Sequence, residues 1–285
     1  MIPAAFDYLA PESLQEALAA LAQHGDDAKI LAGGQSLLPV LRMRLNAPEV
    51  VIDLGKVAAL RGIREDGDAI VIGAMTTYAD ILASDLVRRH LALLAEAVAT
   101  VADPQIRHRG TLGGSLVHAD PAGDVGPAVL ALDATLVIAG QGGSVRTVPV
   151  GEFFHDMFAT AVGEEEILTE IRLPKHTGWG AAYEKFVRVA QQWSIVAVAA
   201  TVDLTGGSVG GAKVALANMG STPVRAAGVE SALIGQPANA DSAAAAAARV
   251  GEGTNPPSDL NGDAAYRTHL ATVLTRRAVA SAFGE

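Results

Sequence analysis

The sequence predicts an α+β protein built from more than one unit. Three observations support this prediction: apolar strands flank a helix near the N-terminus, several strands follow one another in the middle, and three strands followed by alanine-rich helices end the chain. With 285 residues, of which 50% are hydrophobic and 18% are charged, the chain has enough length and apolar content for two domains.

The N-terminal part predicts a compact β-α-β-type unit over residues 1–54. Residues 11–25 predict a helix, because Ser13 and Glu16 have the spacing of a capping box. The segments AKILA and PEVVIDL predict short strands, with a helical turn broken at Pro39 between them. The strand AKILA runs into a Gly-Gly pair, and the carboxyl ends of strands are common ligand sites in open α/β sheets.

The middle of the chain predicts helices and an antiparallel set of strands. We expect a strand at 69–77, one amphipathic helix at 85–102 and a short helix from Gly126. Residues 103–124 are rich in Gly, Asp and Pro without a regular period, which predicts a long functional loop. The expected antiparallel strands are 135–140, 143–150 and 166–174. We expect a boundary segment at 174–180.

The last third of the chain changes character. It predicts three strands with a turn before the third and then helices, of which the six-alanine run reflects high helix propensity. The expected strands are 181–190, 193–204 and 212–219, with the turn at 205–211. The expected helices are 224–235, 242–250 and 263–283.

Composition excludes several classes of function. The net charge of -10 argues against a nucleic-acid or anionic-lipid surface, which would need clustered cations. The absence of cysteine excludes disulfides, zinc–thiolate sites, cysteine nucleophiles and iron–sulfur clusters held by this chain. No signal peptide or transmembrane segment is recognised, so we expect a cytoplasmic protein.

Two Gly-Gly pairs are the main candidates for a binding site. Each is followed by a hydroxyl residue within two positions, so backbone N–H groups and a hydroxyl could form an anion nest in residues 32–36 and again in 111–115. Two such nests would suit the diphosphate of a dinucleotide. Neither a P-loop nor the Rossmann fingerprint is present. The alternative is that each pair forms only a tight turn.

Other candidate residues have ordinary structural alternatives. Ser208 lies in a G-x-S-x-G match, but a strand follows it, which places it at a hairpin tip rather than in a hydrolase elbow. His118, Asp120 and Asp124 form a weak metal pattern, and Asp124 could instead cap the next helix or accept a hydrogen bond from a ligand. Trp193 predicts either a core residue or a flat surface for a ring.

Four motifs then resemble a known family. The segments LAGGQSLLP, VIGAMTT, ADPQIRHRGTLGGSLVHADPAGD and AAYEKF are similar to those of the FAD-binding medium subunits of molybdenum hydroxylases, the xanthine dehydrogenase family. Aerobic carbon monoxide dehydrogenases are the nearest branch. The resemblance runs over nearly the whole chain, including AAYRTHLATVLTRRAV near the C-terminus.

The resemblance implies a vanillyl-alcohol-oxidase-like (p-cresol methylhydroxylase-type) FAD-binding domain over residues 1–175. This domain would have an N-terminal subdomain, 1–54, and a middle subdomain, 55–175. A smaller C-terminal α+β domain over 178–285 would contain a three-stranded antiparallel sheet with helices.

The resemblance also implies which residues bind the cofactor. No catalytic residue for the substrate and no metal ligand is expected in this chain. The expected FAD-binding residues are Leu31, Ala32, Gly33, Gly34, Gln35, Ser36, Leu37, Leu38, Ala102, Thr111, Leu112, Gly113, Gly114, Ser115, Gly123, Asp124, Leu168, Lys185 and Trp193. One departure is that Gln192 stands where the family commonly has an acidic residue, which we expect to alter hydrogen bonding near the flavin.

By resemblance, the chain is the electron-transfer subunit of a larger oxidoreductase. A small partner subunit would carry two 2Fe–2S clusters, and a large partner subunit would carry the molybdenum cofactor. Electrons would pass through FAD to a quinone or another acceptor, in a dimer of heterotrimers that reaches the inner face of the membrane through the complex. Open alternatives are hydroxylation of N-heterocycles, aldehydes or purines by the partner, a stand-alone flavin oxidoreductase, and a non-catalytic nucleotide-binding module.

Overall fold

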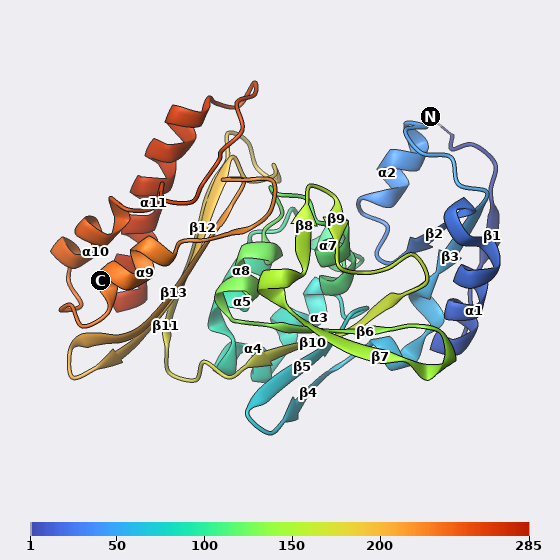
Figure 1. Cartoon of the computed structure of the whole chain (residues 1–285), viewed down its shortest axis with the longest axis horizontal. Helices are drawn as coiled ribbons and strands as arrows, with labels where there is room; N and C mark the ends of the chain where they lie inside the picture. The colour runs from blue at the N-terminus through green and yellow to red at the C-terminus, as the bar shows by residue number, and fades with distance from the viewer. Residues whose placement is uncertain (1, 285) are drawn as a thin grey trace.

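The computed structural model describes residues 2–284 and contains three sheet-based units in a row. Figure 1 shows the N-terminal sheet at one end, a five-stranded sheet with helices in the middle, and the C-terminal sheet with its helices at the other end. The first and last units therefore approach the middle unit from opposite sides.

The N-terminal unit is a three-stranded parallel sheet with the order β1-β3-β2. Its strands are β1 (Asp7–Leu9), β2 (Ala28–Leu31) and β3 (Val50–Asp53). Helix α1 (Leu14–His24) packs on the sheet, and the Ser13 side chain accepts a hydrogen bond from the Glu16 amide at 3.1 Å, which confirms the expected N-cap. Strand β1 was not expected, because three largely exposed residues give no apolar pattern.

The segment after the first Gly-Gly pair is an uninterrupted helix, α2 (Leu37–Arg42). The expectation of a break at Pro39 is wrong. Pro39 is the third residue of the helix, in the first turn, where backbone N–H groups have no partner inside the helix. A proline at this position therefore removes no helical hydrogen bond.

The middle unit is built on a five-stranded antiparallel sheet with the order β4-β5-β10-β6-β7. Its central strand, β10, comes last in the sequence and joins two hairpins. The strands are β4 (Ile63–Asp66), β5 (Ala69–Gly73), β6 (Thr135–Ala139), β7 (Val145–Pro149) and β10 (Ile167–Pro174), with a separate pair, β8 (Phe154–Asp156) and β9 (Ala159–Thr160). The expected antiparallel strands of this region are confirmed.

Six short helices accompany this sheet. They are α3 (Tyr78–Ala83), α4 (Asp85–His90), α5 (Ala92–Ala99), α6 (Pro104–Arg107), α7 (Leu112–His118) and α8 (Val125–Ala131). The expected single helix at 85–102 is divided at Leu91, whose φ of -137° leaves the helical region while its side chain stays fully buried. The region expected to be an irregular loop contains α6 and α7, whose starts are capped by Asp103 and Thr111.

The C-terminal unit is an antiparallel sheet with the order β11-β12-β13-β14, covered on its outer face by helices (Figure 1). The sheet has four strands instead of the expected three, since a strand of two residues, β14, pairs with β13. The elements are β11 (Gly180–Phe186), β12 (Val196–Thr205), β13 (Ser208–Ala217), β14 (Val224–Arg225), α9 (Ala227–Leu233), α10 (Ala240–Ala247) and α11 (Ala264–Phe283). The long closing helix after Asp263 is confirmed.

The C-terminal sheet belongs to two hydrophobic cores. Ala197 and Ala199 of β12 join the core formed by α5 and α8, whereas Val196 and Val198 join the core beneath α11. Because side chains alternate along a strand, this small–large pattern allows the middle helices to pack closely on one face. The middle helices therefore lie between two sheets, which fixes the C-terminal unit against the cavity described below.

Short helical turns fill several connections. Five single-turn 3₁₀ helices occur at Gly25–Asp27, Leu54–Lys56, Ala58–Leu60, Gln141–Gly143 and Val150–Glu152. Among residues 2–284, every helix is too short or too polar to cross a membrane.

Glu96 of α5 generates a prediction about pH and stability. Its carboxylate accepts a hydrogen bond from the amide of Tyr183 at 2.9 Å and so satisfies the edge of β11. Glu96 is exposed as a residue, but partial desolvation raises the pKa of its carboxyl above 4.5, against this hydrogen bond, and Glu184 raises it further. A carboxyl group whose pKa is higher in the folded than in the unfolded protein contributes stability that is fully present below the unfolded-state pKa. This contribution is lost as the pH rises through the folded-state pKa.

We therefore expect Glu96→Gln, which keeps the acceptor oxygen without the charge, to stabilise the protein at about pH 7 but not at about pH 4. The measurement is urea unfolding at both pH values. Glu164→Gln, on an exposed turn, is the control for removing one charge. A stability difference that is the same at both pH values would contradict the assignment.

Candidate functional site

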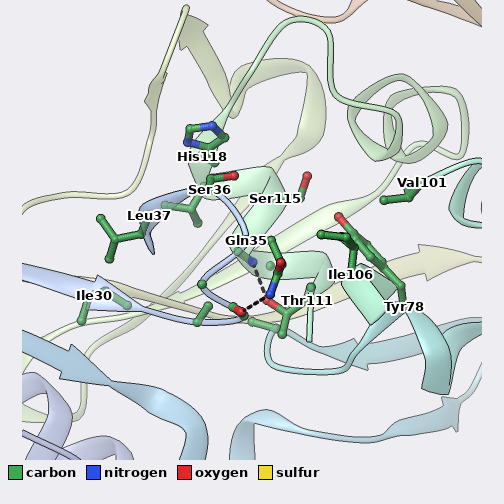
Figure 2. Close-up of a pocket in the computed structure, with 18 of the residues that line it drawn as sticks. Ile30, Gln35, Ser36, Leu37, Tyr78, Val101, Ile106, Thr111, Ser115 and His118 are labelled. Atoms are coloured by element: carbon green, nitrogen blue, oxygen red, sulfur yellow. Dashed lines mark hydrogen bonds between the residues drawn. The ribbon is translucent and has the colours of Figure 1, made fainter. Parts of the chain in front are cut away.

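A cavity of about 880 Å³ lies where the three units meet. Its walls come from the loop after β2, from α7, from β10 and from the loop between β11 and β12. Figure 2 shows Gln35, Ser36 and Leu37 together with Ser115 and His118 of α7 and with Thr111, which caps that helix. Residues from both Gly-Gly segments therefore line the same space, although the sequence separates them by nearly eighty positions.

The first Gly-Gly loop presents free backbone amides. Among residues 2–284, the N–H groups of Gly33, Gly34, Gln35 and Ser36 have no acceptor. Gly34 has a φ of +77°, a conformation that favours glycine, and the Gln35 side chain donates to the Gly33 carbonyl at 3.1 Å (Figure 2). Four successive free amides at a cavity wall suit an anionic ligand such as a phosphate.

The second Gly-Gly pair is organised differently. The amide of Gly113 donates to the Ala74 carbonyl at 2.9 Å, and the amide of Gly114 donates to Thr111 Oγ1 at 3.1 Å (Figure 2). These amides are therefore used inside the chain. The structure has one loop of free amides rather than the two equal nests that we expected from the sequence. The second segment instead brings the hydroxyl of Ser115 to the cavity.

The second pair needs glycine for close packing. A Cβ atom at Gly113 would lie 2.5 Å from the Cβ of Ala74, and one at Gly114 would lie 2.7 Å from Thr111 Oγ1. Gly33 of the first pair has the same need, since its Cβ would lie 2.2 Å from the Arg109 carbonyl oxygen. Close packing therefore requires glycine at Gly33, Gly113 and Gly114, and of these only Gly33 also has a free amide at the cavity.

A buried charged cluster forms another wall. Asp124 is 6% exposed and accepts hydrogen bonds from Tyr183 Oη at 2.9 Å, Ser194 Oγ at 2.8 Å and Lys185 Nζ at 2.8 Å. Burial raises the pKa of Tyr183 and the Asp124 carboxylate raises it further, so the phenol stays protonated and donates. The alternative that the Asp124 side chain caps α8 is wrong, because its carboxylate makes no cap hydrogen bond and accepts instead from three side chains of the C-terminal unit.

Lys185 keeps a donor for a ligand. Its ammonium group bonds Asp124 and, at 3.3 Å, the carbonyl of Thr100, which uses two of its three hydrogens. Its side chain is 9% exposed and also lines the cavity. A third N–H is therefore available to an oxygen acceptor there.

Trp193 lies at the rim of the cavity. It is 49% exposed and belongs to the loop between β11 and β12, so the alternative of a core tryptophan is wrong. The Gln192 side-chain oxygen accepts from the amide of Arg188 at 3.0 Å and from the amide of Val189 at 3.4 Å. Gln192 thus folds its own loop, a role that the sequence did not reveal.

The remaining sequence candidates have clear positions. His118 lines the cavity beside Phe158, with ring centroids 5.1 Å apart, and burial lowers the pKa of its imidazole against the effect of Asp120. Asp120 closes a turn by accepting from the amide of Ala122 at 2.9 Å. Within residues 2–284, no three His, Cys, Asp or Glu side chains are grouped as a metal site would require. Ser208 lies at a hairpin turn, as expected.

Most of the expected binding residues come together. Those lining the cavity are Ala32, Gly33, Gly34, Gln35, Ser36, Leu37, Ala102, Thr111, Gly113, Gly114, Ser115, Asp124, Leu168, Lys185 and Trp193. Those outside its lining are Leu31, Leu38, Leu112 and Gly123. Leu112 is fully buried in the core, and Leu38 is largely exposed on α2.

Sequence reasoning missed several lining residues. Lys29 and Ile30 come from the strand before the first Gly-Gly pair, Met75 and Tyr78 follow β5, and Phe158 lies between β8 and β9. The ends of β2 and β5 were usable signals, because ligands gather at such strand ends. Nothing in the sequence around Phe158 points to the cavity.

Two family models together match almost the whole chain. Residues 4–176 match the FAD binding domain in molybdopterin dehydrogenase. Residues 181–282 match the CO dehydrogenase flavoprotein C-terminal domain.

Individual relatives match over their full lengths. The carbon monoxide dehydrogenase medium chain of Hydrogenophaga pseudoflava is 42% identical, over 99% of both chains. The glyceraldehyde dehydrogenase medium chain of Sulfolobus acidocaldarius is 37% identical, over 98% of both. A solved carbon monoxide dehydrogenase from H. pseudoflava superposes with a TM-score of 0.96 at 42% identity, covering 100% of this chain and 99% of the other. Quinoline 2-oxidoreductase of Pseudomonas putida 86 gives 0.94 at 34% identity, with coverage of 100% and 99%.

The Asp124 cluster generates a stability prediction. Asp124→Asn leaves the Lys185 ammonium buried without a carboxylate, so we expect a loss of about 3–5 kcal/mol. Adding Lys185→Met removes the unpaired charge, so we expect the double variant to be more stable than Asp124→Asn alone. The measurement is a double-mutant cycle by urea unfolding.

Asp85→Asn is the matched control, because Asp85 pairs with Arg88 on an exposed helix face. We expect that change to cost less than about 1 kcal/mol. A comparably small cost for Asp124→Asn would show that the buried cluster does not hold the two units together.

Proposed function

The chain belongs to the family of FAD-binding subunits of molybdopterin dehydrogenases, and we propose that it is the FAD-carrying medium subunit of an aerobic carbon monoxide dehydrogenase. The observation that carries the FAD part of this proposal is the cavity, which is lined both by four free amides and by a buried Lys185–Asp124 pair. Its relatives are subunits of dehydrogenases, and the chain is accordingly an oxidoreductase subunit.

The residues at the cavity fit FAD. The free amides of residues 33–36 would hold the diphosphate, and Ser115 lines the same cavity. The apolar Leu168 and the aromatic Trp193 offer surfaces for a flat ring system, and Lys185 offers an N–H to a ring carbonyl. The cavity volume of about 880 Å³ falls within the range of cofactor sites.

Bound FAD would supply a carrier that accepts electrons singly or in pairs. The chain's own residues would hold that carrier in place. The Asp124 carboxylate holds the Lys185 ammonium at the wall through an ion pair of 2.8 Å. We propose that all the expected cofactor-binding residues that line the cavity contribute to this site, and that the domains are 1–175 and 178–285.

The absence of cysteine supports the need for partners. Electron transfer between this FAD and a molybdenum site requires carriers, and among the 285 residues none is a cysteine that could ligate an iron–sulfur cluster. We therefore propose a small subunit with two 2Fe–2S clusters, a large subunit with the molybdenum cofactor, and a dimer of such heterotrimers. The complex would work in the cytoplasm and pass electrons to a quinone at the membrane.

The proposed overall reaction is the oxidation of carbon monoxide with water to carbon dioxide, two protons and two electrons. Support for this substrate is the 42% identity to a carbon monoxide dehydrogenase medium chain. Relatives named for other substrates are similar at lower identity, such as a nicotine 6-hydroxylase medium subunit at 36%. Because the substrate site would lie in the large subunit, those substrates define the alternative outcomes of the second experiment below.

The first experiment tests the cofactor. We expect the purified chain to bind FAD at least tenfold more tightly than FMN, because only FAD carries a diphosphate for the amides of residues 33–36. Fluorescence titration measures both affinities. Equal affinities would contradict the role of the amide loop.

A pair of glycine variants sharpens this test. Gly34 and Gly207 have φ values of +77° and +81°, so alanine should strain both backbones by roughly 1–2 kcal/mol. We expect Gly34→Ala to weaken FAD binding at least tenfold and Gly207→Ala, at a hairpin tip, to leave it unchanged. Equal effects of the two variants would mean that general strain, and not the loop, controls binding.

The second experiment tests the partners and the substrate. We expect co-expression with neighbouring genes to yield a complex whose flavin absorbance bleaches on addition of carbon monoxide, whereas the isolated chain stays oxidised. Bleaching by an aldehyde, a purine or an N-heterocycle, but not by carbon monoxide, would reassign the substrate. Bleaching of the isolated chain by a small substrate would favour a stand-alone flavin oxidoreductase, and flavin binding without any reduction would favour a non-catalytic module.

A further inference from the structure

One wall of the cavity depends on a loop without regular structure. The loop joins β11 to β12 and contributes Gln191, Gln192 and Trp193 to the lining. Its root is closed by a hydrogen bond from the amide of Ile195 to the Phe186 carbonyl at 3.0 Å. The residue after Trp193, Ser194, is anchored by its hydroxyl to Asp124 at 2.8 Å, and its carbonyl accepts from the Asn218 side chain at 2.9 Å. The freedom that remains to the Trp193 ring therefore depends on what holds the tip of the loop, residues 187–192.

The loop is folded by its own side chain. Gln191 has a φ of +67°, which is unusual for a residue with a Cβ atom. The oxygen of Gln192 accepts from two amides of the same loop, those of Arg188 and Val189, at 3.0 and 3.4 Å. These contacts give the loop a shape but do not attach it to the rest of the protein.

One oxygen outside the loop receives two donors from it. Asn261 Oδ1 accepts from the Arg188 guanidinium at 2.7 Å and from Gln192 Nε2 at 3.3 Å. The guanidinium has only donors, so the atom of Asn261 that faces it must be the oxygen. The side chain at position 192 must then donate a hydrogen bond to this same oxygen. Glutamine can donate one, and an ionised acidic side chain cannot. Gln192 and Asn261 are thus matched to each other.

Asn261 is itself held by Asp259, which in turn pairs with a buried arginine. The carboxylate of Asp259 accepts from the backbone N–H of Asn261 at 2.7 Å and from the Arg267 guanidinium at 2.7 Å. Arg267 is fully buried on α11 and also donates to the Ile195 carbonyl, at the root of the loop. The same guanidinium therefore connects the root of the loop with the turn that holds its tip.

We propose that Asn261 is a positioning residue for the cavity, which fixes the loop between β11 and β12 and thereby places the Trp193 ring. The identity of the ligand beside that ring rests on the proposed function, but the position of the ring does not. If the turn that contains Asn261 only led into α11, changing it would affect the stability of the C-terminal unit without affecting Trp193. The two roles therefore differ in a measurable way.

The first test follows Trp193 in the full chain without flavin. The chain has two tryptophans, so Trp179→Phe leaves Trp193 as the only indole emitter. We expect Asn261→Ala to raise the acrylamide quenching constant about twofold, since a ring that is 49% exposed can at most double its exposure. The anisotropy decay should gain a component on the nanosecond timescale of loop motion.

Two variants serve as controls. Asn261→Asp keeps an acceptor oxygen for both donors, so we expect it to restore the parent quenching constant. Asn239→Ala removes the N-cap of α10, far from the cavity, so it should lower the melting temperature and leave Trp193 unchanged. The comparison of Asn261→Ala with Asn261→Asp is repeated with Trp179 in place, so that the result does not depend on the Trp179→Phe background.

The second test measures FAD affinity. We expect Asn261→Ala to weaken FAD binding about tenfold, because the freed loop must be ordered again when the ligand binds, and Asn261→Asp to restore it. Parent-like quenching in Asn261→Ala, a failure of Asn261→Asp to restore it, or an unchanged affinity beside a freed Trp193 would each overturn the positioning role. A parent chain that does not bind FAD would overturn the proposed function, and the quenching data would still decide whether Asn261 holds the loop.

Discussion

The carboxylate of Asp124 is the interaction on which the cavity depends. It lies at the start of α8 in the middle unit, and all three of its side-chain donors belong to the C-terminal unit. A buried carboxylate is stable only when such donors compensate for lost hydration. The pairing therefore fixes the two units in one relative position. The same arrangement holds the Lys185 ammonium close to the ligand space.

The hydrophobic packing supports this arrangement. The alanines of β12 let α5 and α8 approach one face of the C-terminal sheet, and the valines of the same strand fill the core beneath α11. Between the units, Arg225 bonds Asp133 at 2.7 Å. The sheet is thus a shared layer, and the loop that carries Trp193 starts from a rigid strand pair.

Glycine has two separate functions at the cavity. Gly34 allows a turn that leaves successive amides free, whereas Gly113 allows α7 to pack against Ala74 while its amide is used internally. The two pairs look alike in the sequence because both require the absence of a Cβ atom. Only the acceptors around each amide distinguish a binding loop from a packing contact.

The sequence by itself determined the α+β class, most strands, the helix capped by Ser13, the closing helix from about Asp263, and the two Gly-Gly segments of the cavity. These depend on local patterns: alternation, capping residues and paired glycines. Only the tertiary structure decided the break at Leu91, the partners of Asp124 and the attachment of the Trp193 loop to Asn261. These depend on contacts between residues far apart in the chain, where burial and donor–acceptor matching override local preference.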